Sequence, residues 1–239
     1  MFALSTLVLA VVVVRCQANW SEEEPELYYY GIEESERGLR VCAAREACSL
    51  QLRRYWRAAA LVRLCRCARR QRCDKPAPGD HRIELNNHAH FQFCQPVTEW
   101  PLCKVAETSL MIETTYDRIN PDELEENHHK NIQLTPPKIT FNCLCRTPNY
   151  WRLSSRPANN TAIQNYQCTS LPVCRSGELC GNVSNDMYAL YQSCLCPKNH
   201  ICIHNGGIPH LHISEVLYNG IGWRAHCVNI ANDSSYEDY

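Results

Sequence analysis

Short runs of alternating apolar and polar residues give the clearest periodic signal in this chain. Between Arg82 and Cys94, five apolar side chains would share one face of an extended backbone: Ile83, Leu85, Ala89, Phe91 and Phe93. The opposite face would carry His88, His90 and Gln92. A period of two residues predicts a half-buried strand. The pattern returns at Ile139–Cys143 and Ile221–Cys227, so we expect several short antiparallel strands.

Two other segments favour helices. The segment 43–64, AAREACSLQLRRYWRAAALVRL, has no Gly or Pro and is rich in Ala, Leu and Arg. Strong helix formers of this kind predict one longer helix. The segment 185–193 is similar to a shorter version of it, with Ser184 or Asn185 as the N-cap.

The amino terminus has the pattern of a secretory signal peptide. An apolar run from Phe2 to Val14 is shorter than the roughly 20 residues that a membrane-spanning helix needs. Cys16-Gln17-Ala18 then supplies a small-residue cleavage site, which predicts a leader at 1–18. The remaining chain is therefore expected to be secreted into the extracellular space without a membrane anchor.

Cysteine content supports an oxidising compartment. The chain has 17 cysteines in 239 residues, and removing Cys16 with the leader leaves an even number. An even count is typical of a disulfide framework in a secreted protein. The residues expected to form eight disulfides are Cys42, Cys48, Cys65, Cys67, Cys73, Cys94, Cys103, Cys143, Cys145, Cys168, Cys174, Cys180, Cys194, Cys196, Cys202 and Cys227.

The cysteines repeat along the chain. Cys65, Cys67 and Cys73 return 129 residues later as Cys194, Cys196 and Cys202, and the pair Cys42 and Cys48 has the spacing of Cys168 and Cys174. A looser middle copy contains a third Cys-x-Cys element. We interpret these as three degenerate modules, with bridges between modules expected because the counts are uneven. The two cysteines of each Cys-x-Cys should bond to different partners, since i and i+2 are too far apart to pair.

The expected fold is therefore a small, disulfide-rich α+β protein with short antiparallel strands and one longer helix. The predicted organisation is an acidic, disordered segment (19–40), three cysteine modules (41–92, 93–166 and 167–228) and an acidic, disordered tail (229–239). Cleavage after Arg40 would make the first segment a propeptide.

Charge is distributed unevenly, although the formal net charge is only −1. Glu22 to Arg37 holds seven glutamates, whereas Arg40 to Lys75 holds eleven basic residues. The candidate partner-binding residues on the predicted helix are Arg53, Arg54, Tyr55, Trp56 and Arg57, followed by Arg63, Arg66, Arg69, Arg70 and Arg72. Such a surface would suit a sulfated glycan, an acidic receptor loop or a channel mouth. The alternative is that these arginines balance the protein's own glutamates, in which case the binding surface would lie around His200 to His212.

Motifs for catalysis or for a cofactor are not found. The spacing of His200 and His204 matches a helical zinc pair, but Ile201 stands where a metalloprotease has glutamate. No G-x-S-x-G motif is present, and an even cysteine count leaves no thiol to act as a nucleophile. We therefore expect no catalytic residue, metal or cofactor. Sequons place candidate glycosylation at Asn159, Asn182 and Asn232.

The cysteine frame, together with LNNHAHFQFCQPV, ALYQSCLCPKNHICIHNGG and GWRAHC, resembles scoloptoxin family eleven, which are secreted, cysteine-rich arthropod proteins. The resemblance covers roughly Cys42 to Cys227. It implies a toxin-like, non-enzymatic protein that binds an extracellular receptor or impairs an ion channel. It maps no binding residue beyond the cysteines. A matrix or signalling protein of a non-venom tissue is the alternative, and a secreted hydrolase is the second alternative.

Overall fold

The computed structural model describes residues 24–73, 79–104, 107–155 and 162–230. These residues form fourteen strands, one α-helix and two short 3-10 helices at Glu36–Gly38 and Gly79–His81. The strands make three separate sheets that follow one another along the chain. The protein is therefore predominantly β, and the expected α+β class with a longer helix is wrong.

The first sheet has the strand order β1-β3-β2-β5-β4. Its strands are β1 (Glu26–Tyr28), β2 (Ala47–Leu52), β3 (Ala60–Arg63), β4 (Arg82–Glu84) and β5 (Ala89–Phe93). Strand β1 runs parallel to β3, and the remaining neighbours are antiparallel. The single alternating strand expected over 82–94 is thus a hairpin of two strands, and β5 is buried along its whole length.

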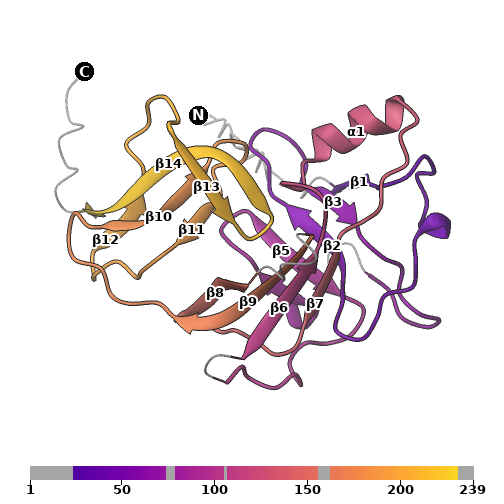
Figure 1. Cartoon of the computed structure of the whole chain (residues 1–239), viewed down its shortest axis with the longest axis horizontal. Helices are drawn as coiled ribbons and strands as arrows, with labels where there is room; N and C mark the ends of the chain where they lie inside the picture. The colour runs from indigo at the N-terminus through magenta and orange to yellow at the C-terminus, as the bar shows by residue number, and fades with distance from the viewer. Residues whose placement is uncertain (1–23, 74–78, 105–106, 156–161, 231–239) are drawn as a thin grey trace, which may run out of the picture.

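The second sheet has the order β7-β6-β9-β8. Its strands are β6 (Thr108–Glu113), β7 (Lys138–Phe141), β8 (Asn149–Ser155) and β9 (Ile163–Ser170). Helix α1 (Pro121–His129) lies between β6 and β7 in the sequence and beside β1 in space (Figure 1). The Asn120 side chain caps it by accepting from the Asp122 amide, and Pro121 suits the first helical turn.

The third sheet has the order β11-β10-β14-β12, and β13 also pairs with β14. Its strands are β10 (Leu179–Ser184), β11 (Leu190–Gln192), β12 (His200–Ile203), β13 (Leu211–Glu215) and β14 (Tyr218–Asn229). Figure 1 shows this sheet, in orange and yellow, at one end of the molecule, with the other two sheets close together at the opposite end.

The first two sheets share one hydrophobic core. Phe141 of β7 packs edge-on against both Phe91 and Phe93 of β5, with ring centroids 5.2 Å apart in each case. The third sheet has its own core, which contains Trp223, Ala225 and several disulfides. Sulfur therefore supplies much of the interior of the third sheet, as the small number of large apolar residues in the sequence suggests.

All sixteen cysteines in the described residues are paired, which confirms the prediction of a disulfide framework. The bridges fall into three groups: Cys42–Cys65, Cys48–Cys73 and Cys67–Cys94; Cys103–Cys143 and Cys145–Cys168; and Cys174–Cys194, Cys180–Cys202 and Cys196–Cys227. The members of every Cys-x-Cys bond to different partners, as their spacing requires. Two bridges cross the module boundaries drawn from sequence, because Cys94 directly follows β5, the last strand of the first sheet, and Cys168 lies in β9, the last strand of the second.

The first and third groups have the same connectivity, in which the first cysteine pairs with the third, the second with the fifth and the fourth with the sixth. The counterpart of Cys42 and Cys48 is therefore Cys174 and Cys180, one cysteine later than the sequence comparison suggested. Sulfur atoms also cluster equivalently, with Cys48, Cys67 and Cys73 within 4.8 Å of one another, as are Cys180, Cys196 and Cys202. The second group has no described bridge equivalent to Cys48–Cys73.

Both predicted helices are wrong. The segment 43–64 contains β2 and β3, and 185–193 contains a turn followed by β11. A continuous helix between Cys42 and Cys65 would hold them about 35 Å apart at 1.5 Å per residue. Their disulfide instead requires a Cα–Cα distance of 5.1 Å, which a hairpin provides. Pairing and bridging thus override a high helix propensity. The α-helix lies elsewhere, in the acidic stretch after Asn120, which forms α1.

The acidic segment 19–40 was expected to be disordered, but its described part is built into the fold. Strand β1 pairs with β3, and the side chain of Tyr30 is only 3% exposed. The leader at 1–18 and most of the tail at 229–239 lie outside the described residues. None of the described helices is long and apolar enough to cross a membrane.

Candidate functional site: an aromatic groove and an exposed turn

The predicted partner-binding residues lie in the turn that joins β2 to β3, not on a helix. Trp56 is at the tip of this turn, and its side chain is 100% exposed. Its φ of 62° is in the left-handed region, which costs a bulky L residue about 1 kcal/mol. A fully exposed indole on a strained backbone has no evident role in folding, which makes Trp56 a candidate for binding.

The arginines in this turn are largely occupied by contacts within the protein. The Arg54 guanidinium donates to Glu26 Oε2 at 2.6 Å and to the Ala58 carbonyl, and it lies over the Tyr28 ring. Arg57 donates to Asp122 Oδ1 at 2.8 Å, which ties the turn to α1. The alternative of internal charge balance therefore holds for Arg54 and Arg57, and these side chains shape the turn.

Tyr55 brings the turn into contact with the third sheet. Its hydroxyl lies 3.1 Å from Nε2 of His88, and its ring packs on the His88 ring. The ring also meets Tyr188 edge-on at 5.8 Å between centroids. Residues 133 positions apart in the sequence therefore form one surface. Burial lowers the pKa of His88, so its imidazole is neutral at physiological pH.

Tyr188 belongs to a cluster of three nearly parallel aromatic rings, with His204 and Trp223. The Tyr188 and Trp223 rings are nearly parallel with centroids 5.5 Å apart, and His204 stacks on Trp223 at 4.8 Å. Trp223 Nε1 donates to the Gly207 carbonyl, and the Gly206 amide donates to His204 Nδ1. These hydrogen bonds hold the loop after β12 and fix the ring orientations before any partner arrives.

A shallow cavity of about 390 Å³ opens among these rings, between the first and third sheets. We call it the aromatic groove. Its lining residues are Tyr55, Asn87, Val183, Tyr188, Leu190, Cys202, Ile203 and His204. Tyr55, Tyr188 and Ile203 are 53%, 44% and 42% exposed, so the groove presents apolar surface to solvent. Exposed aromatic residues around a preformed groove are typical of protein interaction sites.

The structure thus joins two regions that the sequence suggested separately, the turn with Tyr55 and Trp56 and the histidine segment with His204. Sequence reasoning missed Tyr188 and Trp223. Tyr188 was assigned to a predicted helix, but it lies in a turn with a φ of 55°.

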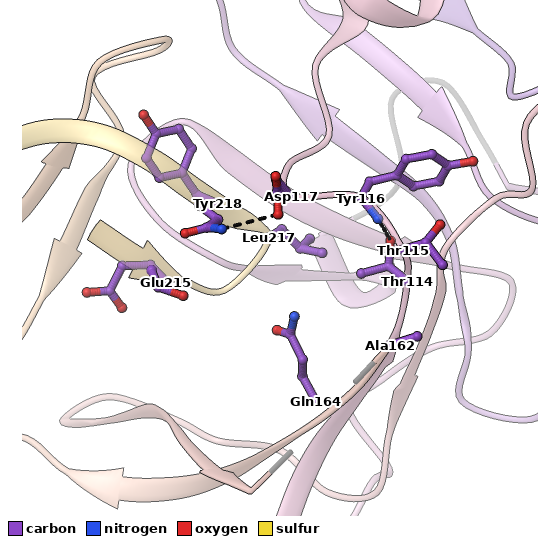
Figure 2. Close-up of a pocket in the computed structure, with 11 residues that line it drawn as sticks. Thr114, Thr115, Tyr116, Asp117, Ala162, Gln164, Glu215, Leu217 and Tyr218 are labelled. Atoms are coloured by element: carbon purple, nitrogen blue, oxygen red, sulfur yellow. Dashed lines mark hydrogen bonds between the residues drawn. The ribbon is translucent and has the colours of Figure 1, made fainter. Parts of the chain in front are cut away.

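A second, polar pocket of about 280 Å³ lies between the second and third sheets (Figure 2). Asn219 Nδ2 donates to Asp117 Oδ1 at 3.1 Å across it and so links the two sheets. Burial raises the pKa of the Glu215 carboxyl at its edge, although the Asn182 amide donates to that carboxylate. Hydroxyl, amide and carboxylate groups dominate its lining, so it would suit a polar group and not an apolar anchor.

The remaining predicted sites are distributed over the fold. Asn182 is in β10, and the amide nitrogen that a glycan would occupy donates to Glu215. Asn159 and Asn232 lie outside the described residues. His200 is away from the aromatic groove, with its Nε2 2.9 Å from the Ser176 hydroxyl. The absence of catalytic residues, metal and cofactor stays a prediction.

Comparisons with known proteins were made for the whole chain. No protein-family model matches it, and no curated protein matches it. A solved structure described as the crystal structure of unliganded Argos superposes with a TM-score of 0.49 at 20% sequence identity, covering 86% of this chain and 98% of that chain. At that score and identity the likeness carries no argument about function. The resemblance to scoloptoxin family eleven stays a prediction.

Proposed function

We propose that the chain is a secreted, non-enzymatic binding protein that docks on an extracellular partner protein through Trp56 and the aromatic groove. The observation that carries this proposal is the contact between Tyr55 and Tyr188, which joins the exposed turn to the third sheet. Trp and Tyr are the side chains that most often dominate the binding energy of protein interfaces. Eight disulfides fit an extracellular location, because such frameworks persist in oxidising compartments.

The partner class that we propose is a receptor or channel with an exposed extracellular domain, in line with the toxin-like resemblance. A rigid groove favours such a partner because little conformational entropy is lost when a prearranged surface binds. The alternative, a matrix or signalling role in a non-venom tissue, uses the same surface. Expression restricted to a venom gland would favour the toxin role, whereas broad epithelial or developmental expression would favour the alternative.

The test uses fluorescently labelled protein on intact cells that display a panel of extracellular receptor and channel domains. Cells are treated with heparinase so that sulfated glycans cannot contribute. The wild type should bind saturably, and Trp56→Gly and Tyr188→Ala should each bind with an affinity at least about tenfold lower. Glycine suits the positive φ at position 56, so loss of folding would not explain the effect.

Val173→Ala is the matched control, because Val173 is also a large exposed apolar residue, at 73% exposure, and does not line the groove. It should bind as the wild type does. Equal affinity of Trp56→Gly, Tyr188→Ala and the wild type for a saturable partner would exclude this surface as the docking site.

A further inference from the structure

Apart from Arg45 and Arg53, the arginines of the basic segment 40–75 fall into two sets with different surroundings. In one set, each guanidinium forms an ion pair with a carboxylate: Arg40 with Glu46, Arg54 with Glu26, Arg57 with Asp122, and Arg63 with Glu36. Arg63 is buried, with only 1% exposure. Arg54 and Arg63 bind the acidic amino-terminal segment, Arg57 binds α1, and Arg40 binds Glu46 directly before β2. None of these guanidiniums is available to a polyanion.

The other set lies in the loop after β3, and we call it the arginine loop: Arg66, Arg69, Arg70 and Arg72. All four side chains are exposed. Within the described residues, none of the four has a carboxylate at ion-pair distance. Arg66 donates from Nε to the Leu39 carbonyl at 3.1 Å, which leaves its two terminal nitrogens for other acceptors. The loop therefore concentrates positive charge on a protein whose formal net charge is −1.

Disulfides hold this loop in one shape. It begins at Cys65 and Cys67, which are bonded to Cys42 and Cys94, and it ends at Cys73, which is bonded to Cys48. Inside it, the Gln71 amide donates to the Ala68 carbonyl at 3.1 Å and makes a tight turn. Arg70 has a φ of 71° within this turn. A short loop fixed at three cysteines has little backbone freedom to lose, so binding an anion costs little backbone entropy.

Guanidinium groups suit the oxygens of sulfate and phosphate because they donate two parallel hydrogen bonds. Three classes of polyanion carry sulfate or phosphate: nucleic acids, anionic lipids and sulfated polysaccharides. Nucleic acids lie inside the cell, and anionic lipids are concentrated in the cytoplasmic leaflet of the membrane. A disulfide framework of this density places the chain outside the cell, where the abundant polyanion is sulfated polysaccharide.

We propose that the arginine loop is a binding site for a sulfated glycosaminoglycan, separate from the aromatic groove. The glycan would hold the protein near the cell surface or matrix while the groove remains free for its partner. The site is not the turn at Arg53–Arg57, which the sequence favoured, because Arg54 and Arg57 are already paired.

The test compares the triple variant Arg69→Gln/Arg70→Gln/Arg72→Gln with a control that removes the same charge from other exposed positions, Arg146→Gln/Arg175→Gln/Arg224→Gln. Affinity for a defined heparin oligosaccharide is measured at physiological salt. The arginine-loop variant should bind about tenfold more weakly than the wild type, since exposed ion pairs are individually weak and three of them are removed. The control should stay within about twofold of the wild type.

Elution is compared between heparin and a sulfopropyl resin of equal charge density. This comparison distinguishes binding at a specific site from ion exchange that depends only on overall charge. The wild type should need more salt on heparin than on the resin, and only the arginine-loop variant should lose this difference. Equal losses for both triple variants would overturn the proposal, as would unchanged binding of the arginine-loop variant. Retention of heparin affinity by Trp56→Gly is expected, so failure of the groove proposal and failure of this one are distinguishable. Mass spectrometry confirms eight disulfides in every variant.

Discussion

The guanidinium of Arg54 donates to the carboxylate of Glu26 at 2.6 Å, across 28 residues of sequence. Arg54 is nearly buried, with a side chain only 8% exposed, whereas the Glu26 side chain is 46% exposed. Tyr28 completes the arrangement by donating its hydroxyl to the same carboxylate at 2.7 Å. This arrangement fixes β1 against the turn that carries Tyr55 and Trp56, so the acidic segment supports the candidate site.

Replacing Glu26 with Gln should loosen β1. A neutral amide accepts a weaker hydrogen bond from Arg54, and because Glu26 is half exposed we expect a loss of about 1 kcal/mol or less from the free energy of unfolding. Faster hydrogen exchange of the β1 amides is the measurement, with Glu33→Gln, an exposed residue of the same segment, as the control. Unchanged exchange in β1 would mean that strand pairing holds the segment without this ion pair.

The ion pair between Arg54 and Glu26 should stabilise β1 less at acid pH. Hydrogen bonds from Arg54 and Tyr28 lower the pKa of the Glu26 carboxyl below its ordinary value of 4.5. As the pH falls, the unfolded state therefore takes up a proton first. The stabilisation that is present above pH 4.5 is lost as the pH falls through the lower pKa of the folded state. Glu26→Gln should remove this part of the acid dependence of β1 exchange. An equally steep dependence in the variant would assign it to another carboxyl.

Two equivalent disulfides, Cys48–Cys73 in the first group and Cys180–Cys202 in the third, should contribute stability without specifying the fold. Cys48→Ala/Cys73→Ala and Cys180→Ala/Cys202→Ala should each lower the free energy of unfolding by about 3 kcal/mol, since each bridge closes a loop of 25 or 22 residues. The second sheet forms with only two bridges, so we expect native circular dichroism in both variants. Urea unfolding measures the loss, and scrambled bridges in peptide maps would contradict the expectation.

His90 should make the first sheet sensitive to mild acid. Burial, aided by the charges of Arg82 and Arg53, lowers the pKa of His90 from 6.5 to about 4. The unfolded state thus binds the proton first, and the protein should lose about 2 kcal/mol of stability between pH 7 and pH 5 from this residue. Urea unfolding of His90→Gln should be correspondingly less dependent on pH. The exposed His210→Gln serves as the control and should follow the wild type.

Glu215, at the edge of the pocket in Figure 2, should make the stability of the protein depend on pH in the direction opposite to His90. Burial raises the pKa of its carboxyl, so the folded state holds the proton more tightly and stability falls as pH rises above the unfolded pKa. Glu215→Gln keeps an oxygen that can accept from Asn182 but removes the charge. The variant should therefore be more stable than the wild type at pH 7 by up to about 1 kcal/mol. Equal stability of the two proteins at pH 7 would show that the carboxylate is adequately solvated.

The sequence by itself determined the features that depend on covalent geometry and local pattern. An even cysteine count predicted the disulfide framework, and the distance limit of a disulfide predicted that Cys65 and Cys67 take different partners. Alternation predicted the strand at Ile139 and Phe141, because a period of two residues places their side chains on one buried face. These arguments need no knowledge of where the chain goes next.

Only the tertiary structure decided the secondary structure of segment 43–64, the ordered state of the acidic segment before it, and which residues form the candidate binding surface. Helix propensity differs by less than about 1 kcal/mol per residue between most side chains, so strand pairing and the Cys42–Cys65 bridge outweigh it. The ion pair of Arg54 with Glu26 and the contact of Tyr55 with Tyr188 join residues that no local pattern relates. Contacts over such separations depend on how the three sheets are arranged in space, and a local sequence pattern does not specify that arrangement.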